Sequence, residues 1–227
     1  MRLRTPGMRA MAVQAFAILA VGASCSPAGS GGLTPLMVYS TSAARPWVAK
    51  AYDCSPAGTA LVLAGAGDAD IIIRLTEPKP LAVPAFQIGE DDLLVVTHPQ
   101  VAVGALSVAQ VQSIFAGEVE NWSDLGGADQ PVQVWSFAPS VDIQWYFDRM
   151  VLGGRPVSSW ARLAVSAQHM SDAVGEIPGS IGLLPRRWKA GNTREVLRIS
   201  SVPVLALTPK PPGRAAAELI ACMQATP

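Results

Sequence analysis

The sequence predicts an α/β fold, because strand-like and helix-like segments alternate along the chain. Half of its 227 residues are hydrophobic and only 15% are charged, a composition that supports a buried core and excludes a disordered chain. Ile71–Ile73 is a β-branched run, typical of a strand covered on both faces. Leu106–Gly154 shows the pattern helix, turn, strand, loop, helix. The length allows one large domain or two small lobes.

Residues 1–25 are predicted to be a secretory signal with a lipobox, and so to lie outside the fold. Three arginines within the first nine residues precede an apolar run of eleven, Met11–Val21, which is too short for a comfortable bilayer span. The segment Gly22–Cys25 is similar to a bacterial lipobox, although it begins with Gly where that motif usually has Leu. We expect acylation of Cys25, with residues 26–32 as a flexible tether. An ordinary secreted protein cleaved nearby and an uncleaved anchor are the alternatives.

The charge balance argues against a nucleic-acid partner. The chain has 17 basic and 17 acidic residues, and 14 basic residues remain without the three arginines of the leader. A mildly acidic protein whose one dense basic run is the short segment Arg186–Lys189 lacks the extended basic surface that DNA or RNA requires. Metalloprotease, serine-hydrolase, Walker-loop and dinucleotide fingerprints are all missing from the sequence. His98 has no further ligand at metal-binding spacing, so we expect no metal or redox cofactor, and an enzyme is the weaker class.

A hydroxyl-rich turn follows the first expected strand. The strand covers Leu36–Tyr39, the turn is Ser40-Thr41-Ser42, and a helix is expected from about Ala43 to Tyr52. Such a turn caps the helix and also directs hydroxyl and N–H groups beyond the carboxyl end of the strand, where α/β proteins bind ligands. Capping alone is the alternative interpretation.

Three further segments complete the first part of the chain. Thr59–Ala64 fits a helix or a strand, whereas Asp70–Leu75 fits a buried strand. Arg74, near the end of that strand, is either a surface terminus or a charge at the mouth of a binding site. Leu93–Val96 is another apolar strand.

The second part of the chain opens on a segment with a chemical signal at each boundary. Ser107 has capping-box spacing with the glutamine three residues later, so a helix should begin there, and Gly117 should end it. A strand is expected over Pro131–Trp135. The loop that follows ends in Ser140, an N-cap for a helix from about Val141 to Leu152.

The remaining elements continue the alternation. They are helical stretches at Ser158–Leu163 and Ser166–Gly175, strands at Ile181–Leu184, Val196–Ile199 and Val202–Leu207, and a closing helix at Gly213–Ala225. The basic run Arg186–Lys189 either contacts a partner or forms a solvated turn, and we favour the turn. Four tryptophans cluster here (Trp122, Trp135, Trp145 and Trp160). We expect them in the core rather than in a sugar-binding cleft.

Two segments of this second part resemble a known family. IFAGEVENWSDLGG, at Ile114–Gly127, and VGEIPGSIGLLP, at Val174–Pro185, are similar to the phosphate-type substrate-binding proteins of ABC importers. The resemblance implies a two-lobed periplasmic binding protein-like fold of the second topological type. In that fold, mixed sheets are flanked by helices and the ligand cleft lies between the lobes. Lobe 1 would comprise residues 33–97 and 190–227, and lobe 2 residues 98–189.

The resemblance also assigns the ligand contacts. The first anion loop would be Ser40–Ser42, with Arg74 at the next strand end. The second loop, Ser-Gly-Thr in the family, reads Ser140-Val141-Asp142 in this chain. Val141 carries a side chain where glycine lets the backbone come close. Asp142 would place a carboxylate at the positive end of a helix dipole and repel an anion, unless it caps its helix and points away. We therefore expect weaker phosphate binding than in the family.

The function that the resemblance implies is capture of a small anion, phosphate or another oxyanion, for an ABC importer. The protein would be an extracytoplasmic lipoprotein of the cell envelope and a monomer. Its partners would be the transporter permease and, through the lipid on Cys25, the membrane. One alternative is a sensor or accessory domain of the same fold with a degenerate anion site. A weaker alternative is an exported enzyme that uses a carboxylate such as Asp142.

Two cysteines remain once Cys25 is assigned to the anchor. Cys54 and Cys222 are an even pair in an exported protein, the setting in which disulfides form. In the fold that the resemblance implies, the helices that carry them both belong to lobe 1. We therefore expect a disulfide, with two buried free thiols as the alternative.

Overall fold

The computed structural model describes residues 32–189 and 191–225, in which eight strands form one mixed sheet. The strand order is β2-β1-β3-β8-β4-β7-β5-β6. The strands are β1 (Thr34–Ser40), β2 (Thr59–Leu63), β3 (Ile71–Leu75), β4 (Ala85–Thr97), β5 (Gln133–Ser136), β6 (Arg162–Leu163), β7 (Ser180–Pro185) and β8 (Arg194–Leu207). The α-helices are α1 (Trp47–Asp53), α2 (Val108–Phe115), α3 (Asp142–Met150), α4 (Ala167–Glu176) and α5 (Arg214–Ala225). The predicted leader, Cys25 and the tether up to residue 31 lie outside the described residues.

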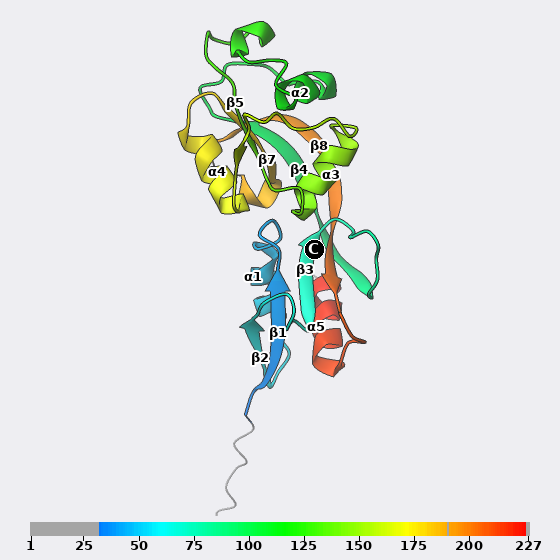
Figure 1. Ribbon diagram of the computed structural model, residues 1–227. Helices are drawn as coiled ribbons and strands as arrows, with labels where there is room; N and C mark the ends of the chain where they lie inside the picture. The colour runs from blue at the N-terminus through cyan, green and yellow to red at the C-terminus, as the bar shows by residue number, and fades with distance from the viewer. Residues whose placement is uncertain (1–31, 190, 226–227) are drawn as a thin grey trace, which may run out of the picture. The chain divides into compact units, whose positions relative to one another are not determined.

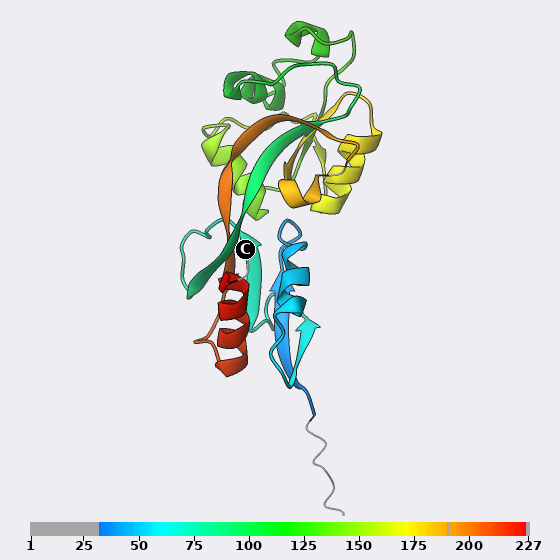
Figure 2. The same cartoon turned by 180° about the vertical axis from the view of Figure 1, so that it is seen from behind.

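Two long antiparallel strands, β4 and β8, connect two groups of elements (Figures 1 and 2). Lobe 1 contains β1, β2 and β3 with helices α1 and α5, and β3 pairs with the end of β8. Lobe 2 contains β5, β6 and β7 with helices α2, α3 and α4, and β7 pairs with Leu93–Thr97 of β4. The predicted α/β fold class is confirmed. The lobe boundaries predicted from the sequence stay a proposal, since β4 and β8 have strand neighbours from both lobes.

Local signals in the sequence gave the correct ends of several helices. Ser107 Oγ accepts the Gln110 N–H at 3.2 Å, and Gln110 Oε1 accepts the Ser107 N–H at 2.9 Å, so the predicted capping box is confirmed. Gly117, just beyond α2, has the left-handed φ of 79° that the prediction required. Ser166 caps α4 by accepting the His169 N–H at 3.1 Å. Each of these contacts lies within four residues.

Other predicted elements were wrong for reasons of chain context. No helix forms at Ser158–Leu163: the segment makes a turn and its last two residues pair with β5 as β6. Helix α1 begins at Trp47 rather than Ala43: residues 42–46 form turns closed by bonds between residues three apart, and Pro46 has no N–H to donate to the Ser42 carbonyl. The two strands predicted at 196–199 and 202–207 are the single strand β8, in which the Pro203 carbonyl accepts the Thr76 N–H at 2.9 Å.

The tryptophan prediction was only partly correct. Trp122 and Trp135 are buried, and Trp122 Nε1 donates to the Gly179 carbonyl at 2.9 Å. Trp145 is half-buried on α3. Trp160 is 87% exposed, so it contributes nothing to the core.

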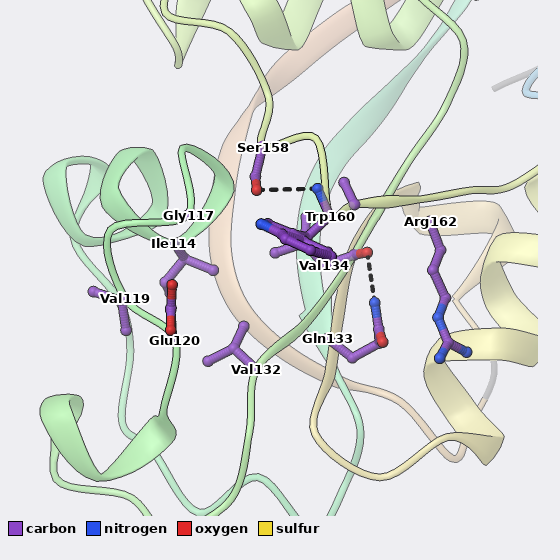
Figure 3. A pocket seen from close by; sticks show the side chains of 11 residues that line it. Ile114, Gly117, Val119, Glu120, Val132, Gln133, Val134, Ser158, Trp160 and Arg162 are labelled. Carbon is purple, nitrogen blue, oxygen red and sulfur yellow. Dashed lines mark hydrogen bonds between the residues drawn. The ribbon is translucent and has the colours of Figure 1, made fainter.

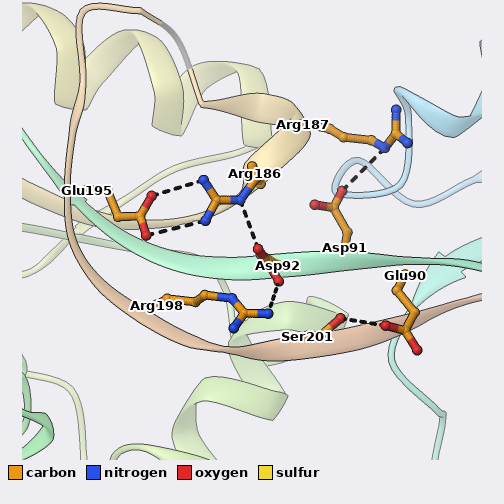
Figure 4. Close-up of polar contacts among 8 residues, drawn as sticks. All are labelled: Glu90, Asp91, Asp92, Arg186, Arg187, Glu195, Arg198 and Ser201. Atoms are coloured by element: carbon orange, nitrogen blue, oxygen red, sulfur yellow. Dashed lines mark hydrogen bonds and ion pairs between the residues drawn. The ribbon is translucent and has the colours of Figure 1, made fainter.

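The basic run Arg186–Lys189 is more than a solvated turn. Its short 3-10 helix, η2 (Arg186–Trp188), places Arg186 against β4 and β8, where it pairs with Asp92 at 2.9 Å and Glu195 at 3.1 Å (Figure 4). Arg198 of β8 also binds Asp92, at 2.6 Å, and this hydrogen bond holds the pKa of Asp92 below its usual value. The network ties η2 to the two connecting strands, although exposed ion pairs of this kind each contribute little to stability.

Within lobe 1, a disulfide links a segment near the start of the described chain to one near its end. It joins Cys54, at the C-terminal end of α1, to Cys222 in α5, with 5.6 Å between the Cα atoms. The predicted disulfide between Cys54 and Cys222 is therefore confirmed. Across the described residues, no helix is long and apolar enough to span a membrane. The described residues also contain no cluster of three or more His, Cys, Asp or Glu side chains that could hold a metal ion.

Candidate functional site between the lobes

The carboxyl ends of β1 and β3 meet at one edge of the lobe 1 sheet. These strands are parallel neighbours, with Ser40 opposite Ile73. The Thr41 N–H donates to the Ile73 carbonyl at 3.0 Å, which holds the turn after β1 against the end of β3. Thr41 and Leu75 are therefore brought close together, although 34 positions separate them in the sequence. This edge is where α/β sheets bind their ligands.

Asp142 of lobe 2 reaches this edge of lobe 1. It is the first residue of α3 and only 5% exposed. Its Oδ2 accepts the Thr41 hydroxyl at 2.9 Å and the Leu75 N–H at 3.2 Å, while its Oδ1 accepts the Ile143 N–H of its own helix at 3.0 Å. Asp142 thus contacts its helix N-terminus without pointing away. Its Oδ2 faces lobe 1, and Val141 rather than Asp142 is the N-cap residue of α3.

The electrostatics of the carboxylate are set by opposing effects. Burial raises the pKa of Asp142 above its ordinary value. The Thr41 hydrogen bond, the positive charge of Arg74 and the N–H groups of Ile143 and Leu75 act in the opposite direction. Arg74 is half-buried, and its Nε donates to the Leu75 carbonyl at 3.4 Å. The site therefore supplies one fixed cation and several neutral donors to an oxygen anion.

Two buried hydroxyls near the same strand ends have no hydrogen-bond partner within the described part of the chain. They are Ser40 Oγ at the end of β1 and Thr76 Oγ1 directly after β3. Thr76 also has a φ of 61°, which is rare for a β-branched residue and costs about 1–3 kcal/mol. Unsatisfied buried hydroxyls and backbone strain of this kind occur at binding sites, where water or a ligand completes the hydrogen bonding.

Three further contacts join the lobes around this carboxylate. The Ser42 Oγ accepts the Ala167 N–H of α4 at 3.3 Å, and Trp188 Nε1 donates to the Ala43 carbonyl at 2.9 Å. The Lys79 ammonium lies 5.8 Å from the centre of the Trp145 ring on α3. Lobe 2 therefore contacts the whole turn after β1 and the loop after β3.

The three residues predicted for the second anion loop have different surroundings in the structure: Asp142 is buried, whereas Ser140 is exposed. Val141, not Ser140, is the N-cap residue of α3, and its side chain makes no capping hydrogen bond. Ser140 lies one residue before that N-cap, so its predicted capping role is wrong. The sequence interpretation missed the Leu75 N–H, the Thr76 hydroxyl and Trp188. A backbone N–H carries no sequence signal, and only the chain topology brings these groups to Asp142.

Lobe 2 also carries a separate cavity of about 600 Å³ (Figure 3). Its walls come from the end of α2, the segment leading into β5 and residues 158–162. Trp160 and Glu120 are the prominent side chains, and the Trp160 N–H donates to Ser158 Oγ at 3.3 Å. None of the residues that join the lobes lines this cavity, so it is distinct from the site around Asp142.

Comparisons with known proteins place the fold. The family model of the PBP superfamily domain matches residues 24–203. A protein described as a phosphate ABC transporter substrate-binding protein, from Clostridium perfringens and with bound phosphate, aligns with a TM-score of 0.75 at 16% identity over 84% of this chain and 93% of that chain. An ABC-type phosphate transport receptor from Vibrio cholerae gives 0.63 at 19% identity, over 83% and 93%. The CcmR regulatory domain of Synechocystis PCC6803, in complex with 2-PG, gives 0.62 at 9% identity, over 85% and 96%. At these identities the likeness shows the fold alone.

Proposed function

The chain belongs to the PBP superfamily, as its sequence predicts, and we propose that it binds a small oxyanion between its lobes as the substrate-binding protein of an ABC importer. The observation that carries this proposal is the set of groups around the Asp142 carboxylate. The Thr41 hydroxyl and the Leu75 N–H donate to one carboxylate oxygen, and the charge of Arg74 acts on the same carboxylate. Groups that hold a carboxylate oxygen in this way are suited to an oxyanion such as phosphate.

The unpartnered hydroxyls support a ligand larger than one carboxylate. Ser40 Oγ and Thr76 Oγ1 are buried beside the strand ends that bind Asp142, and each can donate to or accept from a further oxygen. A tetrahedral oxyanion has four oxygens, so it offers acceptors for further hydroxyls as well as for the groups that now donate to Asp142. The solved relative from Clostridium perfringens that has this fold contains phosphate.

The cellular setting follows from the segment before the fold. We infer that Cys25 is acylated and that the protein works outside the cytoplasm, tethered to the membrane and paired with a transporter permease as a monomer. The expected signal layout, the lipobox-like Gly22–Cys25 and the importer proteins among its structural relatives support this setting. Binding by lobe closure requires no metal or redox cofactor.

A sensor or accessory role is the second candidate, and one observation favours it. The Asp142 carboxylate already accepts the Thr41 hydroxyl that an anion would need, and a regulatory domain shares the fold. The enzyme alternative has less support, because the Asp142 carboxylate accepts hydrogen bonds from one hydroxyl and two backbone N–H groups, which hold it in a fixed position.

Calorimetry and thermal shift on the purified protein test the proposal. Phosphate, arsenate and sulfate are titrated at constant ionic strength, with chloride as the control anion. A bound oxyanion should raise the melting temperature by mass action, and Arg74→Ala should reduce the affinity. If no oxyanion binds to the wild type or to Asp142→Thr, the importer proposal fails and the sensor role is favoured.

A further inference from the structure

We propose that Asp142 is a tethered ligand: its carboxylate takes the position of a free anion and holds the two lobes together without any solute. The inference rests on the proposed function, because it concerns the regulation of the same site. It goes beyond that function by assigning to the chain a resident competitor for its own solute.

The bonding of the two carboxylate oxygens carries the first step. Oδ2 receives both of its donors from lobe 1, the Thr41 hydroxyl at 2.9 Å and the Leu75 N–H at 3.2 Å. Oδ1 receives the Ile143 N–H of lobe 2 at 3.0 Å. One carboxylate thus bridges the lobes in the way that a bound oxyanion would, with donors from both sides.

Covalent attachment gives this carboxylate an advantage over a free anion. A free solute loses translational and rotational freedom when it binds, whereas a side chain fixed at the start of α3 has lost most of that freedom already. Its effective concentration at the site is correspondingly high. A free oxyanion must therefore break both bonds to Oδ2 before it can use the same donors.

Other hydrogen bonds near the carboxylate also hold lobe 1 and lobe 2 together. Two of these bonds end on the turn that carries Thr41. The Ala167 N–H donates to Ser42 Oγ, and Trp188 Nε1 donates to the Ala43 carbonyl. These bonds need the lobes to be in contact, and Asp142 is the buried charged group among them. Removal of its acceptor oxygens should therefore open the interface and leave the donors available to a solute.

Four proteins separate this role from a merely structural one. Asp142→Ala removes the acceptor oxygens, while Asp142→Asn keeps one acceptor and removes the charge. Thr41→Val removes the hydroxyl from the lobe 1 side. Asp148→Asn is the matched control, because Asp148 lies on the same helix and accepts the Gln144 Nε2 at 2.7 Å within lobe 2.

The first measurement is the rate of amide hydrogen exchange at Leu75, which is monitored by NMR in the absence of added anions. The Leu75 N–H should be protected in the wild type, in Asp142→Asn and in Asp148→Asn. Its exchange should be about 10- to 100-fold faster in Asp142→Ala, in line with the loss of a charge-assisted hydrogen bond. Thr41→Val should accelerate it in the same direction, which gives a second route if Asp142→Ala folds poorly by circular dichroism.

The second measurement is calorimetry with inorganic phosphate. Asp142→Ala should bind phosphate about 10- to 100-fold more tightly than the wild type and the Asp148→Asn control. Faster Leu75 exchange without phosphate binding in any variant would support the tethered ligand and reject the oxyanion function. Unchanged Leu75 exchange in both Asp142→Ala and Thr41→Val would overturn the inference, and equal phosphate affinity in all variants would then leave the oxyanion function intact.

Discussion

The Cys54–Cys222 disulfide allows a quantitative prediction about the stability of lobe 1. The two cysteines are 168 positions apart. In the chain-entropy treatment of cross-links, a loop of that length removes about 5 kcal/mol of conformational freedom from the unfolded chain. We therefore expect that breaking the bridge lowers the free energy of unfolding by up to about 5 kcal/mol, a large share of the 5–15 kcal/mol typical of a domain.

Urea denaturation of Cys54→Ala, Cys222→Ala and the double variant measures this loss. Either single change breaks the bridge, so each should cost nearly as much as the double variant, and the three effects should be strongly non-additive. With a urea slope near 2 kcal/mol per molar, the midpoint should fall by about 2–3 M. Independent, additive effects of about 1 kcal/mol would refute the reasoning. So would two free thiols on titration of the denatured, unreduced wild type.

Three further predictions concern charge, packing and the anchor. Since burial raises the pKa of Asp142 above 3.8, the wild type should lose stability relative to Asp142→Asn as the pH rises through that raised pKa. Urea denaturation of both proteins from pH 4 to 8 tests this, and a pH-independent difference would contradict it. A Cβ on Gly89 would overlap the Trp47 ring, so Gly89→Ala should lower the free energy of unfolding by about 1–3 kcal/mol, whereas Gly104→Ala, which meets open space, should not. Mass spectrometry of membrane fractions should find an acyl group on the wild type and none on Cys25→Ser; a wild type without lipid would show that the lipobox interpretation is wrong.

Local sequence signals were sufficient for elements whose ends depend on nearby residues. Ser107 and Gln110 specify the start of α2 through bonds that span three positions. The failures arose where distant partners decide the conformation. The segment Ser158–Leu163 has helical spacing, but pairing with β5 makes its last two residues a strand. Strand β8 continues through Pro203, because the Pro203 carbonyl still accepts a hydrogen bond from the Thr76 N–H next to β3.

The candidate site was predictable in its residue types and not in its bonds. The family resemblance led us to expect Ser40, Thr41 and Arg74 at a ligand site, and in the structure all three lie at or directly after the ends of β1 and β3. The bonds of Asp142 join positions 101 and 67 residues away, and one of its partners is a backbone N–H. Side-chain chemistry predicted repulsion of a solute by Asp142. It could not predict that the carboxylate would accept hydrogen bonds from the Thr41 hydroxyl and the Leu75 N–H of lobe 1.

Under the proposed importer function, the position of Asp142 constrains how a bound solute could be reported to the transporter. A ligand shifts a conformational equilibrium only by the difference between its affinities for the two states. If the carboxylate already stabilises contact between the lobes, a solute that replaces it gains only the difference between two sets of similar bonds. Signalling then depends on whatever the solute adds, and the unpartnered hydroxyls of Ser40 and Thr76 are the groups available for that addition. Replacing both hydroxyls, by Ser40→Ala and Thr76→Val, should therefore remove the preference for a tetrahedral oxyanion over the tethered carboxylate.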